Sequence, residues 1–201
     1  MSRLDHVTIR VKPKQITAFY PLLTTGFRMT VRPGLSIQDL LCRQLDLDED
    51  YVEKKIQTVF LDGKAVDDLE RTVITDGATL ALSAAMPGLV GATFRRGGFY
   101  SIMRDQITYT AASASTGPKK AGQITIKFFN LIAREIGPKV LCRGIEVNGK
   151  EFKDLFSNKA GRPCEDIAEE VLFNRRRVTC QEIGTFDLED HTILLKVCLP
   201  A

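Results

Sequence analysis

The sequence predicts an α+β fold made of two successive units, and three observations lead to that expectation. Short apolar runs with β-branched or alternating residues recur along both halves of the chain, which is typical of strands. Apolar residues at helical spacing lie between some of these runs. Asp-Gly and Asn-Gly pairs, which favour tight hairpin turns, separate others. We expect the units to span residues 1–100 and 123–201, joined by a linker over residues 101–122.

Composition limits the class of protein. The 201 residues suffice for one large domain or two small ones. The hydrophobic share of 44% and the charged share of 26% are typical of soluble globular proteins. The net charge of +3 is divided as +1 over residues 1–100 (13 basic, 12 acidic) and +2 over residues 101–201 (15 basic, 13 acidic). Neither half therefore has the strong positive charge typical of nucleic-acid or membrane binding.

The lack of a recognisable secretory signal or membrane span, together with the pattern of cysteines, predicts a cytoplasmic protein. The N-terminal region is charged and has no apolar segment of the kind found in secretory signals. The longest uncharged run, residues 77–94, is too short and too interrupted by glycine and proline to span a membrane. Five dispersed cysteines form no C-x-x-C pair, which argues against a zinc or iron–sulfur site and for free thiols. We expect no metal, no cofactor and no membrane association.

The first half begins with two strands and a helix. Residues 7–11 and 27–31 alternate as strands do, and residues 13–21, with a proline at each end, predict an irregular connection. Ser36 stands where a helix N-cap belongs, and an acidic residue three positions later favours the helix start. An apolar stripe at helical spacing follows, and Cys42 beside it is expected to pack rather than react. The acidic residues 46–50 predict a solvated loop.

Two Asp-Gly turns organise the stretch that follows. The pair at residues 62–63 predicts a hairpin between two short strands. The pair at residues 76–77 precedes a buried strand, residues 79–84, which ends at residues 87–88 because proline offers no N–H to a sheet. The first ninety residues thus have the order strand, strand, helix, strand, strand. This is the β-grasp order, in which one helix packs across one face of a mixed sheet.

The segment from Asp76-Gly77 to Met86-Pro87-Gly88 resembles the end of the ubiquitin-like sulfur carriers, which include the small subunit of molybdopterin synthase and the thiamine-pathway carrier. In that family a D-G-x-x-h-x-h strand leads to a C-terminal Gly-Gly whose carboxylate is adenylated and thiolated. The resemblance covers residues 5–90 and implies a β-grasp unit there. In this chain Gly88 takes the place of the penultimate glycine and Leu89 that of the last. An internal residue has no carboxylate to activate, so the resemblance implies a carrier fold whose tail is disabled or redirected.

A second tail candidate lies a few residues further on. Arg95-Arg96-Gly97-Gly98 is similar to the tail of ubiquitin, and cleavage after Gly98 would expose a Gly-Gly terminus. The other interpretation is a flexible basic connection between two modules.

The second half predicts further strands and turns. Residues 123–129 alternate as a strand, the Gly-Pro pair at residues 137–138 predicts a turn, and the Asn-Gly pair at residues 148–149 predicts a hairpin. Residues 165–174 predict a helix.

Two sequence echoes link the halves. Residues 147–155 are similar to residues 61–69, and residues 185–201 are similar to residues 72–88. The second half is therefore interpreted as a diverged β-grasp-like unit. An unrelated α+β module, or an elaboration of the same sheet, remains open.

The densest basic run is Arg175-Arg176-Arg177. These arginines either complement the C-terminus of the predicted helix or bind an anion such as phosphate or nucleic acid. No interleaved aromatic residues provide a stacking platform.

No catalytic motif is present, and we expect no enzyme and no catalytic residue. The sequence lacks a nucleophile elbow, an H-E-x-x-H motif and a P-loop. His6 is expected in a frayed N-terminus. His191, in a turn among carboxylates, is expected to be a surface residue.

The leading hypothesis is a non-enzymatic β-grasp protein that docks a protein partner through its internal tail. The tail candidates are Gly88, Leu89, Arg95, Arg96, Gly97 and Gly98. The resemblance implies a partner in molybdenum or tungsten cofactor assembly or in sulfur transfer, or an adenylating enzyme. One alternative is an RNA- or nucleotide-binding module that uses the basic clusters. Another is a ubiquitin-like precursor processed after Gly98.

Overall fold

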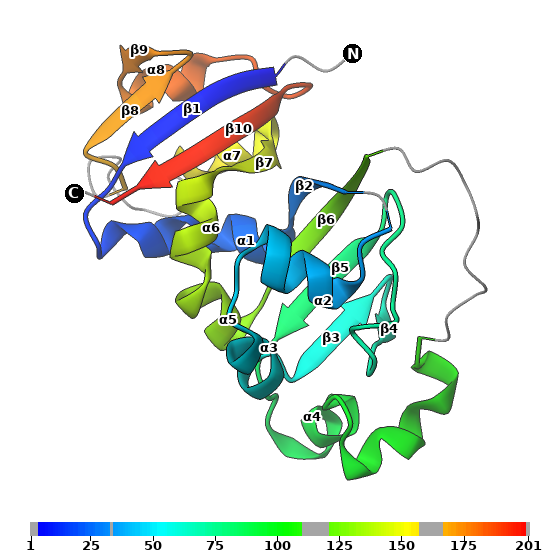
Figure 1. Cartoon of the computed structure of the whole chain (residues 1–201). Coiled ribbons are helices and arrows are strands. Elements are labelled where there is room, and N and C mark those ends of the chain that lie inside the picture. Colours follow the sequence, from blue (N-terminus) through cyan, green and yellow to red (C-terminus); the bar gives the residue numbers. More distant parts are fainter. Residues whose placement is uncertain (1–3, 33, 110–120, 157–166, 200–201) are drawn as a thin grey trace. The chain divides into compact units, whose positions relative to one another are not determined.

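A computed structural model describes residues 4–32, 34–109, 121–156 and 167–199 (Figure 1). Parallel and antiparallel strand pairs occur together with several helices, so the predicted α+β class is confirmed. The chain divides into two compact units. Unit 1 comprises residues 1–27 and 133–201, and unit 2 comprises residues 28–132. Each unit combines segments from both halves of the chain, and the predicted linker falls within the bounds of unit 2, with its residues 110–120 outside the described residues.

Unit 1 is built on a mixed sheet with the strand order β7-β10-β1-β8-β9. Its strands are β1 (Leu4–Arg10), β7 (Ile145–Asn148), β8 (Glu170–Phe173), β9 (Arg176–Val178) and β10 (Thr192–Cys198). The two central strands, β1 and β10, come from opposite ends of the chain and run parallel (blue and red in Figure 1). The other pairs, β7 with β10, β8 with β1 and β9 with β8, are antiparallel.

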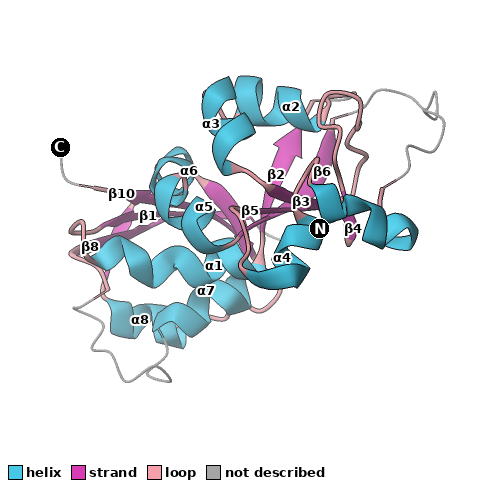
Figure 2. Cartoon of the chain, turned by 90° about the horizontal axis from the view of Figure 1, so that it is seen from below, coloured by secondary structure: helices cyan, strands magenta, loops and turns pink. Residues whose placement is uncertain are grey.

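One face of this sheet packs on the core of the unit, and the other face is exposed to solvent. Alternate residues of the central strands, such as Val7, Ile9 and Leu195, are buried in the core of the unit. The helices of the unit are η1 (a 3-10 helix, Gln15–Phe19), α1 (Tyr20–Thr25), α6 (Gly137–Arg143), α7 (Gly149–Phe156) and α8 (Cys180–Thr185). Figure 2 shows α7 and α8 on one side of the strands. The intervening side chains, including His6 and Lys196, are exposed on the opposite face.

Unit 2 has the strand order β4-β3-β5-β6-β2. Its strands are β2 (Phe27–Val31), β3 (Thr58–Leu61), β4 (Lys64–Ala65), β5 (Thr79–Ser83) and β6 (Gly122–Phe128). The β3–β4 hairpin turns at Asp62 (φ 50°) and Gly63 (φ 77°), both in the left-handed region that a type I′ turn requires. β5 is antiparallel to β3 and parallel to β6. The predicted hairpin and the strands predicted at residues 27–31, 79–84 and 123–129 are confirmed.

Helical segments of unit 2 lie between β2 and β3 and after β5. They are α2 (Ile37–Asp39), η2 (a π-helix, Leu40–Gln44), α3 (Glu49–Lys55), α4 (Gly88–Phe94) and η3 (a 3-10 helix, Phe99–Ile107), and α5 (Asn130–Glu135) lies at the boundary of the two units. Ser36 Oγ accepts a hydrogen bond from the Asp39 backbone N–H at 3.1 Å, which confirms the predicted N-cap. Asp48 Oδ1 accepts from the Tyr51 N–H at 3.2 Å. Part of the predicted acidic loop therefore starts a second helix.

The neighbours of β1 differ from the expectation. The order of elements along the sequence groups β1 with β2 to β5, whereas in the structure β1 pairs with β10 and β8. The position beside β5 is occupied by β6. Alternation of apolar residues identifies a strand and its buried face but not its neighbour. The two candidate neighbours, β5 and β10, also begin with similar sequences, Thr-Leu-Ala-Leu and Thr-Ile-Leu-Leu.

Several predicted turns are helices instead. Residues 13–21 contain η1 and the start of α1, and Pro138 lies in the first turn of α6, where no backbone N–H is needed. Gly149 begins α7 rather than a hairpin. A Cβ at this position would overlap the Leu188 carbonyl oxygen, so this glycine permits a close approach of two segments. Conversely, residues 170–173 form strand β8 instead of a helix. The rest of that predicted helix lies partly outside the described residues.

Among the described residues, every helix is too short or too polar to cross a lipid bilayer.

Candidate functional site

The first candidate site is the segment that follows β5 in unit 2, residues 88–107, which we call the docking segment. It comprises α4 and η3 (green in Figure 1). Seven of the eleven large apolar side chains that are exposed among the described residues belong to it, so exposed apolar surface is concentrated there. They are Leu89, Val90, Phe99, Tyr100, Ile102, Met103 and Ile107. Phe99 is 90% exposed and Ile102 74%.

The first half of the docking segment packs against the rest of unit 2. The Phe94 ring contacts the Phe60 ring of β3, with 5.1 Å between ring centroids. A Cβ on Gly91 would overlap the Met86 carbonyl oxygen, so glycine permits α4 to lie close to the backbone that connects it to β5. Leu89 and Val90, in the same helix, are left exposed.

The Arg-Arg-Gly-Gly stretch is anchored rather than free. Arg96 Nη2 donates to Glu53 Oε2 at 2.6 Å, and the Arg96 backbone N–H donates to the Gln57 carbonyl oxygen. The Gly97 N–H donates to Asp67 Oδ1 at 2.9 Å. The Arg96 side chain is therefore mostly buried, whereas Arg95 is exposed.

A buried arginine anchors the second half. Arg104 Nη2 donates to Asp67 Oδ1 at 2.6 Å, so one carboxylate oxygen accepts from both Gly97 and Arg104. The Arg104 side chain is 1% exposed, and its Nε and Nη1 have no hydrogen-bond partner among the described residues. Asp67 thus contacts both parts of the docking segment, at Gly97 and at Arg104.

The structure therefore separates the predicted tail residues into two groups. Leu89 and Arg95 are exposed, and Gly88, at the start of α4, has a left-handed φ of 77°. Arg96 and Gly97 make hydrogen bonds that anchor the segment, and Gly98 hydrogen-bonds to Arg95 and Ser101 within it. Sequence reasoning missed Asp67 and Arg104, because neither stands out in a motif.

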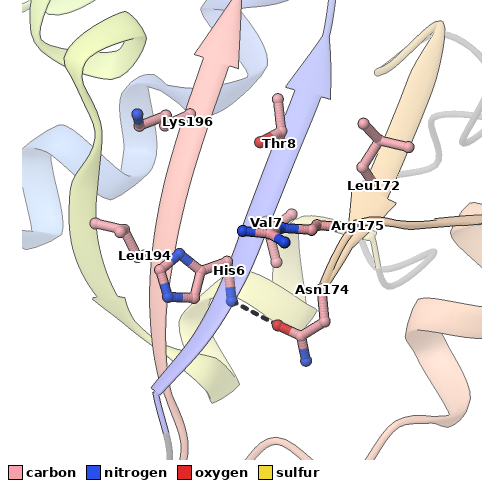
Figure 3. A pocket seen from close by; sticks show the side chains of 8 residues that line it. All are labelled: His6, Val7, Thr8, Leu172, Asn174, Arg175, Leu194 and Lys196. Carbon is pink, nitrogen blue, oxygen red and sulfur yellow. Dashed lines mark hydrogen bonds between the residues drawn. The ribbon is translucent and has the colours of Figure 1, made fainter.

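The second candidate site is a hollow on the open face of the unit 1 sheet, which we call the sheet hollow (Figure 3). Its volume is about 680 Å³. It is lined by His6, Val7, Thr8, Leu172, Asn174, Arg175, Leu194 and Lys196. Strand register explains this gathering. Thr8 lies opposite Leu172 of β8 on one side and Lys196 of β10 on the other, and His6 lies opposite Leu194.

The β8–β9 turn delivers Arg175 to this hollow. Asn174 and Arg175 both have left-handed backbone conformations, with φ of 48° and 70°. Arg176 and Arg177 belong to β9, and Arg177 Nε lies 3.7 Å from Glu170 Oε1. The arginine triplet therefore does not follow a helix as predicted, and only Arg175 lines the hollow.

A partly buried hydrogen-bond network connects the β8–β9 turn to β1. Asp5, only 2% exposed, contacts His191 Nδ1 through Oδ2 at 2.6 Å and accepts a hydrogen bond from Asn174 Nδ2 through Oδ1 at 2.7 Å. Asn174 Oδ1 accepts from the His6 backbone N–H at 2.9 Å (dashed in Figure 3). His6 thus lies inside β1 rather than in a frayed terminus. His191 pairs with a residue far away in sequence. The sequence signal that could have indicated this network is Asp5, an aspartate at an inward-facing position of a strand with alternating apolar residues.

The cysteines differ from the expectation in one respect. Cys42, Cys142 and Cys198 are free, but Cys180 is disulfide-bonded. Burial, and next the neighbouring Cys142 thiol, raise the pKa of Cys198. The prediction of five free thiols is therefore wrong for Cys180.

No group of three or more histidine, cysteine, aspartate or glutamate side chains suited to a metal ion occurs in the part of the chain that the structure describes. Comparisons of the chain with family models, curated proteins and solved structures find no match.

Proposed function

We propose that this protein is a non-enzymatic docking protein of the β-grasp class that binds a protein partner through its docking segment. The observation that carries the proposal is the concentration of exposed apolar side chains on residues 88–107. Contiguous exposed apolar surface on a folded protein marks an interaction site, because burying it is favourable by about 25 cal/mol per Å².

Anchoring makes the docking segment suited to binding. The contacts of Asp67 and Glu53 hold the backbone of the segment while its apolar side chains project from unit 2. A segment already held in one conformation loses less conformational entropy on binding than a free tail does. Phe99 and Tyr100, whose rings meet edge to face with 5.3 Å between centroids, belong to the residue type that dominates binding energy at interfaces.

The arrangement of unit 2 supports the β-grasp part of the proposal. A helical stretch, α2 to α3, connects β2 to β3, and the sheet contains a parallel pair, β5 and β6, flanked by antiparallel β3. In this interpretation β6, from beyond the docking segment, takes the place beside β5 that the sequence order would give to β1. The docking segment then starts where a sulfur carrier has its reactive tail.

The same anchoring favours docking over processing after Gly98. Proteolysis requires a segment that can leave its hydrogen bonds and enter a protease in extended form. Gly97 donates to Asp67, Gly98 donates to the Arg95 carbonyl oxygen, and η3 follows at once. The resemblance to sulfur carriers suggests a partner in molybdenum or tungsten cofactor assembly or sulfur transfer, or an adenylating enzyme.

Nucleic-acid binding is a weaker proposal. It relies on the basic clusters, but Arg96 is paired with Glu53 and Arg177 lies beside Glu170. Phosphate contacts would have to displace these carboxylates.

Site-specific crosslinking tests the proposed docking. A photoreactive residue placed at Met103 in the full chain, expressed in its native host, should give one crosslinked species of defined mass. The same residue at Val73, which is exposed in unit 2 outside the segment, should not. Adding Ile102→Ser to the Met103 probe should remove the crosslink. Equal crosslinking from positions 73 and 103, or a product that contains only two copies of this chain, contradicts docking of a different protein.

A further inference from the structure

We infer that unit 1 carries a binding site for a small organic phosphate in the sheet hollow, with Arg175 as its principal anion contact. This site is independent of the docking segment, since all its residues belong to unit 1. Four features of the described residues lead to it: the size and lining of the hollow, its unpaired basic side chains, the conformation of Arg175, and the network that fixes the turn.

The hollow has the size and lining of a small-molecule site. Its volume of about 680 Å³ lies within the roughly 300–1,000 Å³ typical of such sites. Leu172 and Leu194 provide apolar surface, and Thr8 provides a hydroxyl between them. Such sites combine apolar surface with a few polar groups that fix the ligand's orientation.

The basic side chains around the hollow have no acidic partner among the described residues. Among the described residues, the side chains of His6, Arg175 and Lys196 form no ion pair and no hydrogen bond. The carboxylate of Glu170, on the same face, is already paired with Arg10 at 2.8 Å and lies 3.7 Å from Arg177. The hollow therefore carries positive charge that a bound anion could neutralise.

Arg175 occupies a backbone position that favours glycine. Its φ of 70° is left-handed, and the second position of a type I′ turn is usually glycine because a Cβ is strained there. Strained residues that persist in a fold cluster at functional sites. Figure 3 shows the Arg175 side chain extending from the β8–β9 turn toward β1, so that its guanidinium overlaps Val7 in this view. Lys196 lies further along β10.

The hydrogen-bond network fixes this arrangement before any ligand arrives. Asn174, the first residue of the turn, is held on one side by Asp5 and on the other by the His6 N–H. Asp5 is in turn held by His191. The turn that carries Arg175 is thus tied to β1 at two points, and the guanidinium needs little reorganisation on binding.

The chemistry indicates the class of ligand. A guanidinium presents a planar pair of donors that matches two phosphate oxygens, and an imidazole or hydroxyl can donate to a third. The two leucines require an apolar or planar group on the same molecule. A phosphate monoester the size of a mononucleotide combines both features.

Calorimetric titration of the full chain at low salt tests this inference, with AMP, ribose 5-phosphate and inorganic phosphate as probes. AMP should bind saturably, and inorganic phosphate at least tenfold more weakly. Arg175→Gly should weaken AMP binding at least tenfold while leaving the unfolding midpoint unchanged or higher, because glycine relieves the strained turn. Arg176→Ala, which removes the same charge one residue away, should bind as wild type does.

Three outcomes overturn the inference. One is the absence of saturable binding of any probe at millimolar concentration. Another is an equal loss in Arg175→Gly and Arg176→Ala, which would indicate non-specific charge attraction. A third is equal affinity for inorganic phosphate and AMP, which would leave the leucines without a role. None of these results bears on the docking segment, because both variants lie in unit 1.

Discussion

Replacing Asp67 with asparagine removes the charge that anchors the docking segment while preserving the shape of the side chain. The carboxylate accepts from the Gly97 N–H and from Arg104 Nη2, and the arginine side chain is 1% exposed. Breaking a buried ion pair by removing one partner costs about 3–5 kcal/mol, because the other charge stays buried without compensation. Asp67 itself is 38% exposed, so we expect the lower end of that range, about 3 kcal/mol.

Arg104→Met provides the matched comparison. It removes the buried charge together with the two donors, Nε and Nη1, that have no partner among the described residues. The charge left behind, on Asp67, is 38% exposed and can be solvated by water, so this variant should change stability by less than about 1 kcal/mol. The double variant Asp67→Asn/Arg104→Met should resemble Arg104→Met alone, since no unpaired charge remains.

Hydrogen exchange followed by mass spectrometry is the suitable assay, because it reports opening of the segment separately from global unfolding. A loss of about 3 kcal/mol corresponds to roughly 100-fold faster exchange over residues 95–108. Peptides from β10 in unit 1 provide the internal control and should exchange at the wild-type rate. Similar small effects of Asp67→Asn and Arg104→Met, or faster exchange of β10, would refute the anchoring role of this pair.

Three further predictions concern other parts of the chain. The pKa of Cys198 is raised by burial and then by Cys142, so iodoacetamide should alkylate Cys198 slowly at neutral pH and faster as pH rises. Cys142→Ser should speed this reaction. Equal alkylation rates of Cys198 in the wild type and in Cys142→Ser would contradict this. The pKa of Glu182 is lowered first by the backbone amide and then by the hydroxyl of Thr179, the residue that caps α8. The charged form of Glu182 therefore adds stability at pH values above its unfolded pKa of about 4. This stability is lost as pH falls through the lower pKa of the folded state. Glu182→Gln should thus lower the denaturant midpoint at pH 7 and have no effect in acid. Gly149→Ala should destabilise by about 2–3 kcal/mol through overlap with a backbone carbonyl, whereas Gly184→Ala in α8, where a Cβ meets open space, should be neutral or slightly stabilising in the same denaturation assay.

Local signals in the sequence predicted local structure well. Asp62-Gly63 is a hairpin turn because both positions need a left-handed backbone, and few residue pairs supply it. Ser36 caps a helix because its hydroxyl accepts from an otherwise unsatisfied N–H. Each of these features depends on residues adjacent in sequence, and each is visible without knowledge of the tertiary fold.

Features that depend on distant segments could not be predicted. Asn148-Gly149 has the sequence of a hairpin, but Gly149 is needed because Leu188 comes close to it in space. β1 has the pattern of a strand, but its pairing with β10 depends on residues more than 180 positions away. Similar alternation in several strands leaves the choice of neighbour undetermined at the level of sequence.

The candidate sites likewise combine features that adjacent residues determine with features that depend on distant segments. The tail motifs of the sequence identify the first half of the docking segment, including Leu89 and Arg95, whereas the exposed Ile102 and Met103 of its second half lie in the stretch predicted to be a linker. Asp67 and Arg104, which hold the segment, are 37 residues apart and belong to no motif. The link from Asp5 to Asn174 spans 169 residues. The sheet hollow exists only because β1, β8 and β10 are brought together by the fold.

The affinity of the purified partner, identified by its crosslink to position 103, tests the central claim most directly. Binding should be measured for the wild-type chain, for Phe99→Ser and for Val73→Ser, because Phe99 is 90% exposed within the docking segment and Val73 is 40% exposed outside it. We predict that Phe99→Ser weakens binding at least tenfold, as expected for an aromatic anchor, while Val73→Ser binds as wild type does. Equal affinity of all three proteins would contradict docking through residues 88–107.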